Sequence, residues 1–178
     1  KDLIKYKDNI KEAVNNGVFF LLICGAYQLF GKYYKGVEGN IIPGLEIFNY
    51  YTEAIENRKK RCIGNIVIEA NLNGEKTKII GFENHGGQTF DIDTPFGDVL
   101  FGNGNKFGDS KEGFFLKNVI ATYLHGPLLS KNPELADYII SHCLNRKYNE
   151  DIKLEPLNDD FENLCRKQLL DRFINSNS

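Results

Sequence analysis

The stretch that decides the fold is Val18-Phe-Phe-Leu-Leu-Ile23-Cys24-Gly25-Ala26-Tyr27-Gln28. Its first six residues are an unbroken apolar run, which is typical of a central strand in a parallel sheet that is covered on both faces. Gly25 and Ala26 are small enough for a sharp turn from this strand into a helix. Because open α/β sheets carry their sites at the carboxyl ends of strands, the stretch predicts an α/β fold with Cys24 at such an edge.

The cysteine at this junction has two interpretations. A helix that begins near Ala26 directs free N–H groups and a positive dipole end at the sulfur, which lowers the pKa of Cys24 and favours a nucleophilic thiolate. The alternative is a buried core cysteine, and spacing alone leaves both open. The other three cysteines fit the core better, since Cys143 and Cys165 lie on apolar helix faces and Cys62 begins a strand without a glycine elbow.

A histidine follows a second expected strand in the same way. The strand that ends at residues 121–124 is followed by His125, and Gly126-Pro127 then turns the chain. Cys24 and His125 can therefore lie at one edge of the same sheet, although they are far apart in the sequence. A histidine beside a reactive cysteine can serve as its general base.

Three further polar features are weaker candidates. His85 lies in a turn after a strand, where it either orients a substrate or satisfies loop hydrogen bonds, and we favour the second. His142 lies in the middle of a helix and is interpreted as structural or exposed. The simplest interpretation of the basic run at residues 58–61 is a loop exposed to solvent. Its last member, Arg61, precedes a strand and is the candidate for binding a substrate carboxylate, which arginine holds through two parallel hydrogen bonds.

The rest of the chain gives helix and strand patterns that fit an α/β domain. Asn73-Gly74 is a strong hairpin signal, and Asn132 can cap a helix that has Pro133 in its first turn. This helix and the last one are each expected to bury one apolar face, whereas the glycines from 86 to 108 predict a long irregular region. The expected helices cover residues 2–16, 27–34, 132 onward and about 159–173, and the expected strands cover residues 18–23, 62–70, 76–82 and part of 114–124.

Bulk properties limit the class of protein. The chain has 178 residues, which suggests one domain, and its 42% hydrophobic and 26% charged residues are ordinary for a globular protein. A net charge of -2 gives no electrostatic case for a nucleic acid partner, and no apolar run is long enough for membrane insertion. The four cysteines form no CxxC pair, so we expect reduced thiols in the cytoplasm, no disulfides and no metal site.

Four motifs together resemble one enzyme family. Residues 22–29, Leu-Ile-Cys-Gly-Ala-Tyr-Gln-Leu, resemble the nucleophile elbow of class I glutamine amidotransferases. Residues 123–127, Tyr-Leu-His-Gly-Pro, resemble the catalytic histidine segment of the CobB/CobQ-like branch. Residues 81–89 and 101–105 are most similar to the GatD type, the glutaminase subunits of lipid II isoglutaminyl synthases. The resemblance extends from residue 2 to about residue 151, nearly the whole chain.

The resemblance implies a flavodoxin-like class I glutamine amidotransferase fold, with a mostly parallel central sheet flanked by helices. Residues 1–178 are then a single glutaminase domain whose first strands precede residue 1. The resemblance also assigns roles in the hydrolysis of L-glutamine. Cys24 is the nucleophile, His125 is the general base and acid, and the N–H of Gly25 is one oxyanion donor. Gln28 lines the glutamine pocket and Arg61 binds the substrate.

The sequence departs from the family pattern in three ways. Ala26 replaces a second glycine, a change that we expect to be tolerated. Pro127 stands where triad enzymes often have glutamate, so the base is half of a dyad, or a partner chain supplies a carboxylate. The glycine-rich segment that supplies the other oxyanion donor lies before residue 1 in the family.

The resemblance also implies a partner, a MurT-like Mur ligase subunit that forms a heterodimer with the glutaminase. The sequence shows no P-loop, so the ATP and Mg²⁺ of the overall reaction belong to that partner and no cofactor is expected in this chain. Three alternatives stay open. The chain could be the amidotransferase part of a cobyrinate or cobyrate amide synthase, another cysteine hydrolase of the same shape, or a non-catalytic regulatory subunit.

Overall fold

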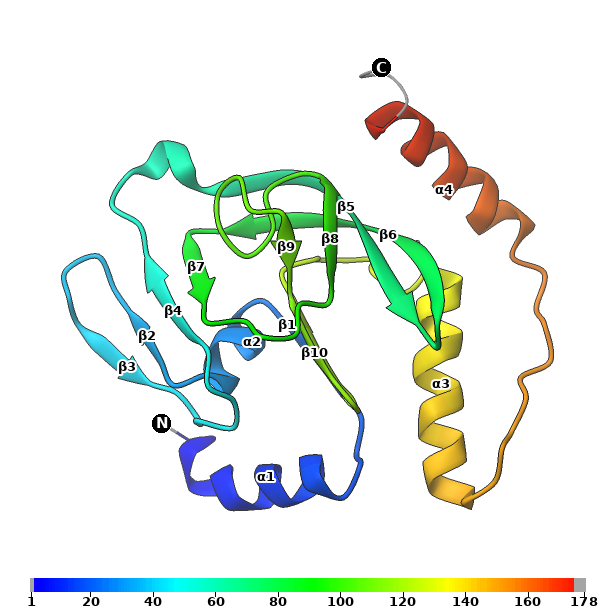
Figure 1. Ribbon diagram of the computed structural model, residues 1–178, viewed down its shortest axis with the longest axis horizontal. Helices are drawn as coiled ribbons and strands as arrows, with labels where there is room; N and C mark the ends of the chain where they lie inside the picture. The colour runs from blue at the N-terminus through cyan, green and yellow to red at the C-terminus, as the bar shows by residue number, and fades with distance from the viewer. Residues whose placement is uncertain (1, 175–178) are drawn as a thin grey trace.

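A three-stranded sheet lies in the middle of the computed structural model, which describes residues 2–174 (Figure 1). Its strand order is β1-β11-β10, and its strands are β1 (Phe20–Ile23), β11 (Val119–Thr122) and β10 (Phe114–Leu116). β1 and β11 are parallel and in register, whereas β10 is antiparallel to β11. The predicted strand before Cys24 is therefore confirmed, and its neighbour is the strand that leads to His125.

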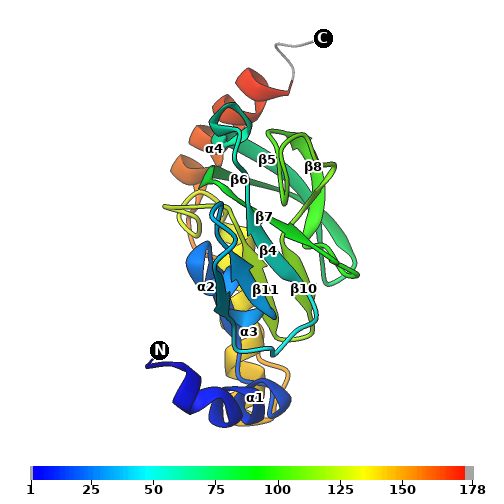
Figure 2. The same ribbon diagram turned by 90° about the vertical axis from the view of Figure 1, so that its left-hand side faces the viewer.

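Helices cover both faces of this sheet, which explains why β1 and β11 are apolar at successive positions. Ile120 and Leu124 pack on one side with Leu135 of α3 (Pro133–Tyr148). Residues at the alternate positions, Ala121 and Tyr123, pack on the other side with α1 (Lys7–Asn15) and α2 (Gly25–Phe30). The turned view shows α1 near one end of the molecule, α4 (Asp160–Phe173) near the other and the strands between them (Figure 2).

Two four-stranded sheets complete the described part of the fold. The first has the order β3-β2-β4-β7, and the second has the order β6-β5-β8-β9. Outside β1 and β11, only β2 and β4 are parallel among the described strands, so the share of parallel pairing is smaller than expected. The strands are β2 (Tyr33–Lys35), β3 (Ile41–Pro43), β4 (Tyr51–Ala54), β5 (Cys62–Leu72), β6 (Glu75–His85), β7 (Gly87–Phe90), β8 (Gly97–Phe101) and β9 (Lys111–Glu112).

The hairpin of β5 and β6 confirms the signal at Asn73-Gly74. Both turn residues have positive φ, 53° at Asn73 and 90° at Gly74, as a two-residue turn that follows the twist of the strands requires. Pairing runs without interruption from Leu72 opposite Glu75 to Cys62 opposite His85. The far end of this long hairpin thus brings Cys62 and His85 side by side.

Several local predictions differ from the structure. The helix after Cys24 ends at Phe30, because Gly31 takes an extended conformation with a ψ of -169°, and β2 then begins at Tyr33. Tyr50 packs so close that a Cβ at Gly31 would lie 2.6 Å from it. The glycine-rich region expected to be irregular contains β7 and β8, since long-range pairing supplies hydrogen bonds that no local pattern indicates.

The prediction that the last two helices each bury one apolar face is wrong in part. Cys143 and Cys165 are exposed, so neither is a core cysteine. In α4, Phe161 is 73% exposed and Leu164 is 55% exposed. The helix packs through Phe173 at its carboxyl end, which contacts Val67 and Ile80 of the β5–β6 hairpin. In the middle of the helix, Arg166 donates a hydrogen bond to the carbonyl of Lys78 in β6. None of the helices in residues 2–174 has the length and apolarity needed to cross a membrane.

Asn132 does not cap α3, although it stands at the expected position. Its buried side chain accepts the N–H of Ile80 at 2.8 Å and donates to the carbonyls of Ile80 and Leu128 at 2.9 and 2.7 Å. Asn132→Ala should lower the free energy of unfolding by roughly 2–4 kcal/mol, because buried backbone groups lose their partners. Urea denaturation measures this change. Asn65→Ala, at an exposed position of β5, is the control, and equal small losses in both variants would contradict the assignment.

Candidate active site

Cys24 lies directly after β1, in a backbone conformation that few side chains adopt. Its φ and ψ are 53° and -106°, and strained conformations of this kind cost about 1–3 kcal/mol and concentrate at functional sites. Its N–H donates to the carbonyl of Thr122 at 2.9 Å, and its own carbonyl accepts the N–H of Gln28 at 3.1 Å. These bonds join the cysteine to β11 on one side and to α2 on the other. The predicted strand–turn–helix elbow is confirmed.

The electrostatics of Cys24 differ from the prediction. The side chain is half-buried, and burial raises its pKa from the ordinary value of a thiol, while a hydrogen bond from the N–H of Gly25 offsets part of the rise. The expected lowering of the pKa by a helix end is therefore wrong for this chain. The six-residue helix α2 gives the sulfur one N–H bond, which is less than the desolvation that it opposes. The thiol consequently needs a base to become nucleophilic.

His125 lies at the same edge of the sheet as Cys24, as predicted. Ile23 pairs with Thr122, so Cys24 follows β1 where β11 continues toward His125. His125 then forms a backbone bridge with Phe82, whose carbonyl accepts the His125 N–H at 2.8 Å. The same carbonyl lies 3.0 Å from Nδ1 of the ring. Because a carbonyl only accepts, Nδ1 carries the proton, and Nε2 of the neutral ring is left as the basic nitrogen.

This hydrogen bond shows which group holds the His125 ring in its orientation. In the described part of this chain, Nδ1 of His125 bonds to the Phe82 carbonyl and not to a carboxylate. A carbonyl fixes the tautomer as a carboxylate does, but it stabilises the charged imidazolium less because it carries only a partial negative charge.

A buried carboxylate that the sequence analysis missed fixes the end of β11. Glu112 accepts the N–H of Tyr123 at 2.7 Å and the hydroxyl of Thr122 at 2.9 Å. Burial raises the pKa of Glu112 to about 8, and these two hydrogen bonds act in the opposite direction. Glu112 lies in a short edge strand among glycines, so no local pattern indicated it. Its contacts hold the segment that presents His125.

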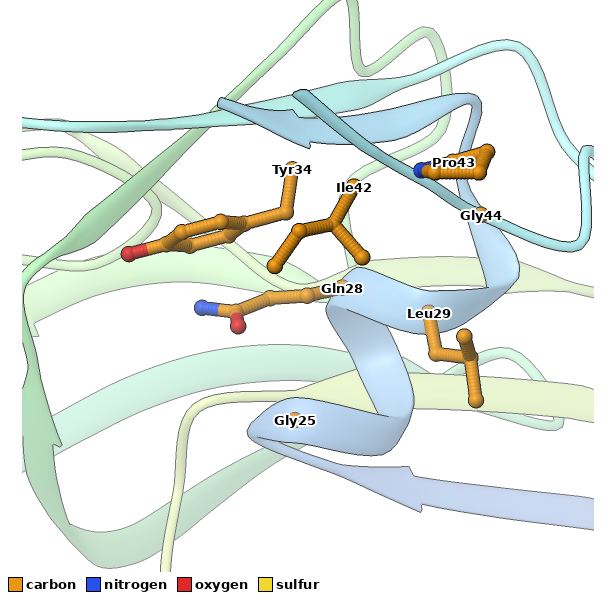
Figure 3. Close-up of a pocket in the computed structure, with 7 residues that line it drawn as sticks. All are labelled: Gly25, Gln28, Leu29, Tyr34, Ile42, Pro43 and Gly44. Carbon is orange, nitrogen blue, oxygen red and sulfur yellow. The ribbon is translucent and has the colours of Figure 1, made fainter. Parts of the chain in front are cut away.

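Gln28 and Gly25 line a pocket of about 300 Å³ beside the elbow. Figure 3 shows the side chains of Gln28 and Tyr34 extending in the same direction, with Ile42 between them. The pocket is lined by Gly25, Gln28, Leu29, Tyr34, Ile42, Pro43 and Gly44. Its size suits a ligand as small as an amino acid, and the Gln28 amide and the Tyr34 hydroxyl are its polar side-chain groups.

A network of hydroxyl groups holds the Gln28 amide in place through hydrogen bonds. Nε2 of Gln28 donates to the hydroxyl of Tyr123 at 3.2 Å. That hydroxyl lies 2.7 Å from Oγ1 of Thr89, which in turn lies 2.9 Å from Oγ1 of Thr52. Tyr123 is fully buried and its ring stacks on His85 with centroids 3.7 Å apart. Tyr123 lies two positions before His125 in the same motif, but no sequence pattern marks it as a residue of the site.

Arg61 does not line the pocket but lies near the turn that borders it. Its Nη2 donates to Oδ1 of Asn84 at 3.0 Å, and a Cβ placed on Gly86 would lie 3.2 Å from Nη1. The next residue, Gly87, approaches Gln28 so closely that a Cβ there would lie 2.7 Å from Nε2. The guanidinium is exposed and has further donors free to bind a ligand.

The remaining histidines and Cys62 have structural surroundings. Nδ1 of His85 lies 2.7 Å from the carbonyl of Gly87, which confirms the loop hydrogen bond that we favoured. His142 is half-buried, and its ring packs against Phe19 with centroids 5.2 Å apart. Cys62 is buried as expected, and its burial raises its pKa to about 12, so it is no rival nucleophile. Among residues 2–174, one set of side chains, Cys62, Glu83 and His85, has metal-binding atoms close together.

Comparisons with known proteins agree with this geometry. Residues 1–133 match the CobB/CobQ-like glutamine amidotransferase domain family. The chain is 42% identical to the Staphylococcus aureus lipid II isoglutaminyl synthase (glutamine-hydrolyzing) subunit GatD over 174 residues. The matched region covers 97% of this chain and 68% of the relative. The GatD subunit of Streptococcus pneumoniae is 40% identical, over 89% of this chain and 60% of the relative. A probable cobyric acid synthase of Methanococcus vannielii is 31% identical, over 90% of this chain and 32% of the relative.

Proposed function

Because the chain belongs to the CobB/CobQ-like glutamine amidotransferase family, we propose that it hydrolyses L-glutamine and delivers the ammonia to a partner ligase that amidates lipid II. One observation carries the proposal. The strained Cys24 follows β1, and His125, with Nε2 as its basic nitrogen, follows the parallel neighbour β11. Parallel neighbouring strands end on the same side of a sheet, which supports a cysteine nucleophile and its base at these two positions.

The proposed reaction begins with proton transfer from the thiol of Cys24 to Nε2 of His125. The sulfur attacks the side-chain amide carbon of glutamine, and the N–H of Gly25 donates to the oxyanion that forms. His125 then protonates the departing nitrogen, so ammonia leaves and a glutamyl thioester remains on the sulfur. A water molecule gives its proton to His125 and attacks the thioester, which releases glutamate and restores the thiol.

The pocket beside the elbow is the proposed glutamine site. Gln28 and Gly25 line it next to Cys24, and the hydroxyl of Tyr123 holds the Gln28 amide in place. The α-carboxylate of glutamine would bind Arg61, whose guanidinium lies over the turn beside the pocket. An arginine at this place supplies the positive charge that the mostly apolar pocket lacks.

Arg61→Ala should raise the Michaelis constant for glutamine about 10- to 100-fold and change kcat by less than about threefold, because a charge-assisted hydrogen bond to the substrate is lost in the ground state and in the transition state alike. Steady-state glutamate release measures both constants. Arg58→Ala is the control, since Arg58 lies at the other end of the same short turn. An unchanged Michaelis constant in Arg61→Ala would remove this residue from the site.

Tyr123→Phe should lower kcat/KM about 5- to 30-fold, mainly through the Michaelis constant. The phenyl ring keeps the stacking on His85, but Gln28 and Thr89 lose the hydroxyl that joins them. The control is Tyr138→Phe, whose ring packs on Phe19 away from the pocket. If both variants kept wild-type constants, the hydroxyl network would have no part in holding the pocket.

The partner follows from the chemistry of ammonia and from the names of the relatives. Free ammonia in neutral water is mostly ammonium, which is not a nucleophile, so it must pass directly to the site that uses it. We propose a heterodimer with a MurT-like Mur ligase subunit in the cytoplasm. That subunit would use ATP and Mg²⁺ to activate the D-glutamate carboxyl of the stem peptide, and the product would be D-isoglutamine. Hydrolysis in this chain would need no cofactor.

Transfer of labelled nitrogen tests this function. The full-length protein is mixed with the ligase subunit, ATP, Mg²⁺ and lipid II, and glutamine carries nitrogen-15 in its side-chain amide. The proposal predicts that the label enters the lipid product only when both proteins are present. Excess unlabelled ammonium should dilute the label little. Glutamate release without labelled product would contradict the acceptor but not the glutaminase step.

A second candidate function rests on the similarity to the probable cobyric acid synthase. In that case the ammonia would serve a corrinoid carboxylate, and an ATP-binding domain would be joined to the same polypeptide. The identity of 31% against 42% for the GatD relative favours lipid II. A regulatory subunit without catalysis is disfavoured, because Cys24 and His125 follow neighbouring strands and Gln28 lines the pocket beside the elbow.

A further inference from the structure

The open end of the β5–β6 hairpin holds three buried side chains that the glutaminase reaction does not use. Cys62 of β5 lies directly opposite His85 of β6, and Glu83 lies two residues before His85 on the same face of that strand. Cys62 and Glu83 are fully buried, and His85 is 3% exposed. Their sulfur, oxygen and nitrogen atoms all lie within 4.8 Å of one another. The hairpin thus fixes three metal-binding atoms on a rigid scaffold.

The imidazole of His85 has a free nitrogen that faces this cluster. Its Nδ1 donates to the carbonyl of Gly87 at 2.7 Å, so Nε2 of the neutral ring has a lone pair. Nε2 is buried and has no hydrogen-bond partner. A histidine that binds a metal through one nitrogen commonly donates the other N–H to a carbonyl, as this one does.

The distance between His85 and Glu83 fits a bridging ion better than a direct contact. Nε2 lies 3.8 Å from Oε2 of Glu83, which is too long for a hydrogen bond. Two ligands at about 2.1 Å from a tetrahedral ion lie about 3.4 Å apart, so a shift of a few tenths of an ångström would allow both atoms to bind one ion.

Glu83 is held in place by the loop after β8. Oε1 accepts the N–H and the side-chain amide of Asn103 at 2.8 and 2.9 Å, and Oε2 accepts the N–H of Gly104 at 3.1 Å. A carboxylate oxygen accepts two bonds, so Oε2 keeps one lone pair. The three donors orient the carboxylate as supporting residues orient a metal ligand.

We propose that Cys62, Glu83 and His85 bind one Zn²⁺ ion. Zinc prefers thiolate, imidazole and carboxylate ligands in a tetrahedral arrangement, and a water molecule would take the fourth position. Binding replaces the thiol proton, which is released to solvent, so that the Cys62 sulfur binds as thiolate. One thiolate and one carboxylate then balance the double charge of the ion, and the buried site is neutral. An isolated buried carboxylate would be less favourable.

The ion would act on stability and not in the hydrolysis of glutamine. It would join the last residues of the hairpin to each other and, through Glu83, to the loop at Asn103. The His85 ring, which stacks on Tyr123, would be fixed under the pocket. The cysteine spacing rules gave no sign of this site, because its ligands are one cysteine, one glutamate and one histidine brought together by strand pairing.

Binding of Co²⁺ as a spectroscopic substitute for Zn²⁺ tests the proposal. The full-length protein is freed of metal with a chelator and titrated with Co²⁺, both as folded protein and during refolding, because the site is buried. Wild type should take up one equivalent and show a near-ultraviolet thiolate-to-cobalt band that Zn²⁺ abolishes. Zn²⁺ should raise Tm by about 5 °C or more. Cys62→Ser and His85→Asn should lose the band and the rise in Tm.

Matched controls keep the result clear. Cys143→Ser and Cys165→Ser remove exposed thiols and should bind Co²⁺ as wild type does. Circular dichroism checks that each variant folds. If Cys62→Ser does not fold, Glu83→Gln takes its place as the variant that lacks a ligand. No thiolate band in wild type under either condition, or a band that survives in Cys62→Ser, would overturn the proposal. Since no glutamine is used, neither result depends on the proposed function.

Discussion

Replacing Cys24 by serine is expected to lower kcat for glutamine hydrolysis by about 10⁴-fold or more, the loss usual for removal of a catalytic nucleophile. The hydroxyl is a much weaker acid than the thiol, so His125 cannot ionise it to a useful extent. Serine has the same shape as cysteine and is slightly smaller, so it fits at position 24, and the pocket lined by Gln28 is untouched. Glutamine binding should therefore stay within about threefold of wild type. Glutamate release and calorimetric binding measure the two quantities.

The controls for this result are the other cysteines. Cys143→Ser and Cys165→Ser alter exposed thiols and should leave the rate unchanged. If Cys24→Ser retained more than about a tenth of the wild-type rate, a loss far below that of a nucleophile, the hydrolysis would not pass through this sulfur.

Replacing His125 by asparagine should lower kcat at neutral pH by about 10³-fold or more, a loss typical when the base of a cysteine nucleophile is removed. The asparagine amide can still donate to the Phe82 carbonyl, so the backbone bridge should survive. The loss is expected to be large because burial raises the pKa of Cys24, and few thiols ionise unaided at neutral pH.

The pH dependence of the His125→Asn variant separates a catalytic role from a structural one. Without its base, the sulfur must lose its proton to solvent, so the residual rate should rise tenfold per pH unit and level off only above the ordinary thiol pKa of 9.0. Wild type should instead reach its plateau at lower pH. The double variant with Cys24→Ser should be little worse than Cys24→Ser alone, since the two residues act as a unit. A uniform loss at every pH, accompanied by a lower Tm, would point to misfolding.

The features that sequence reasoning predicted are those with a local pattern. The apolar run at residues 18–23 identified β1, and Asn73-Gly74 identified the longest hairpin, because each feature lies within a few residues. Cys24 and His125 could be placed at one edge because both follow apolar strands, and parallel strands end on the same side of a sheet.

The features that it missed depend on long-range contacts. Glu112 orients the segment before His125 from a strand that has no pattern of its own. The raised pKa of Cys24 depends on how much of the chain covers the sulfur, which no spacing rule gives. The exposed face of α4 at Phe161 was predicted as buried, because helical spacing of apolar residues does not tell which part of a helix contacts the sheet.

The central claim is that the Cys24 sulfur forms the thioester with glutamine, and covalent labelling tests it most directly. The full-length protein is treated with a glutamine-derived diazoketone, digested and analysed by mass spectrometry. The prediction is one adduct per chain on the peptide that contains Cys24, with labelling slowed by excess glutamine and absent from Cys24→Ser. An adduct on Cys62, Cys143 or Cys165 that tracks the loss of activity, or complete inactivation with Cys24 unmodified, would contradict it.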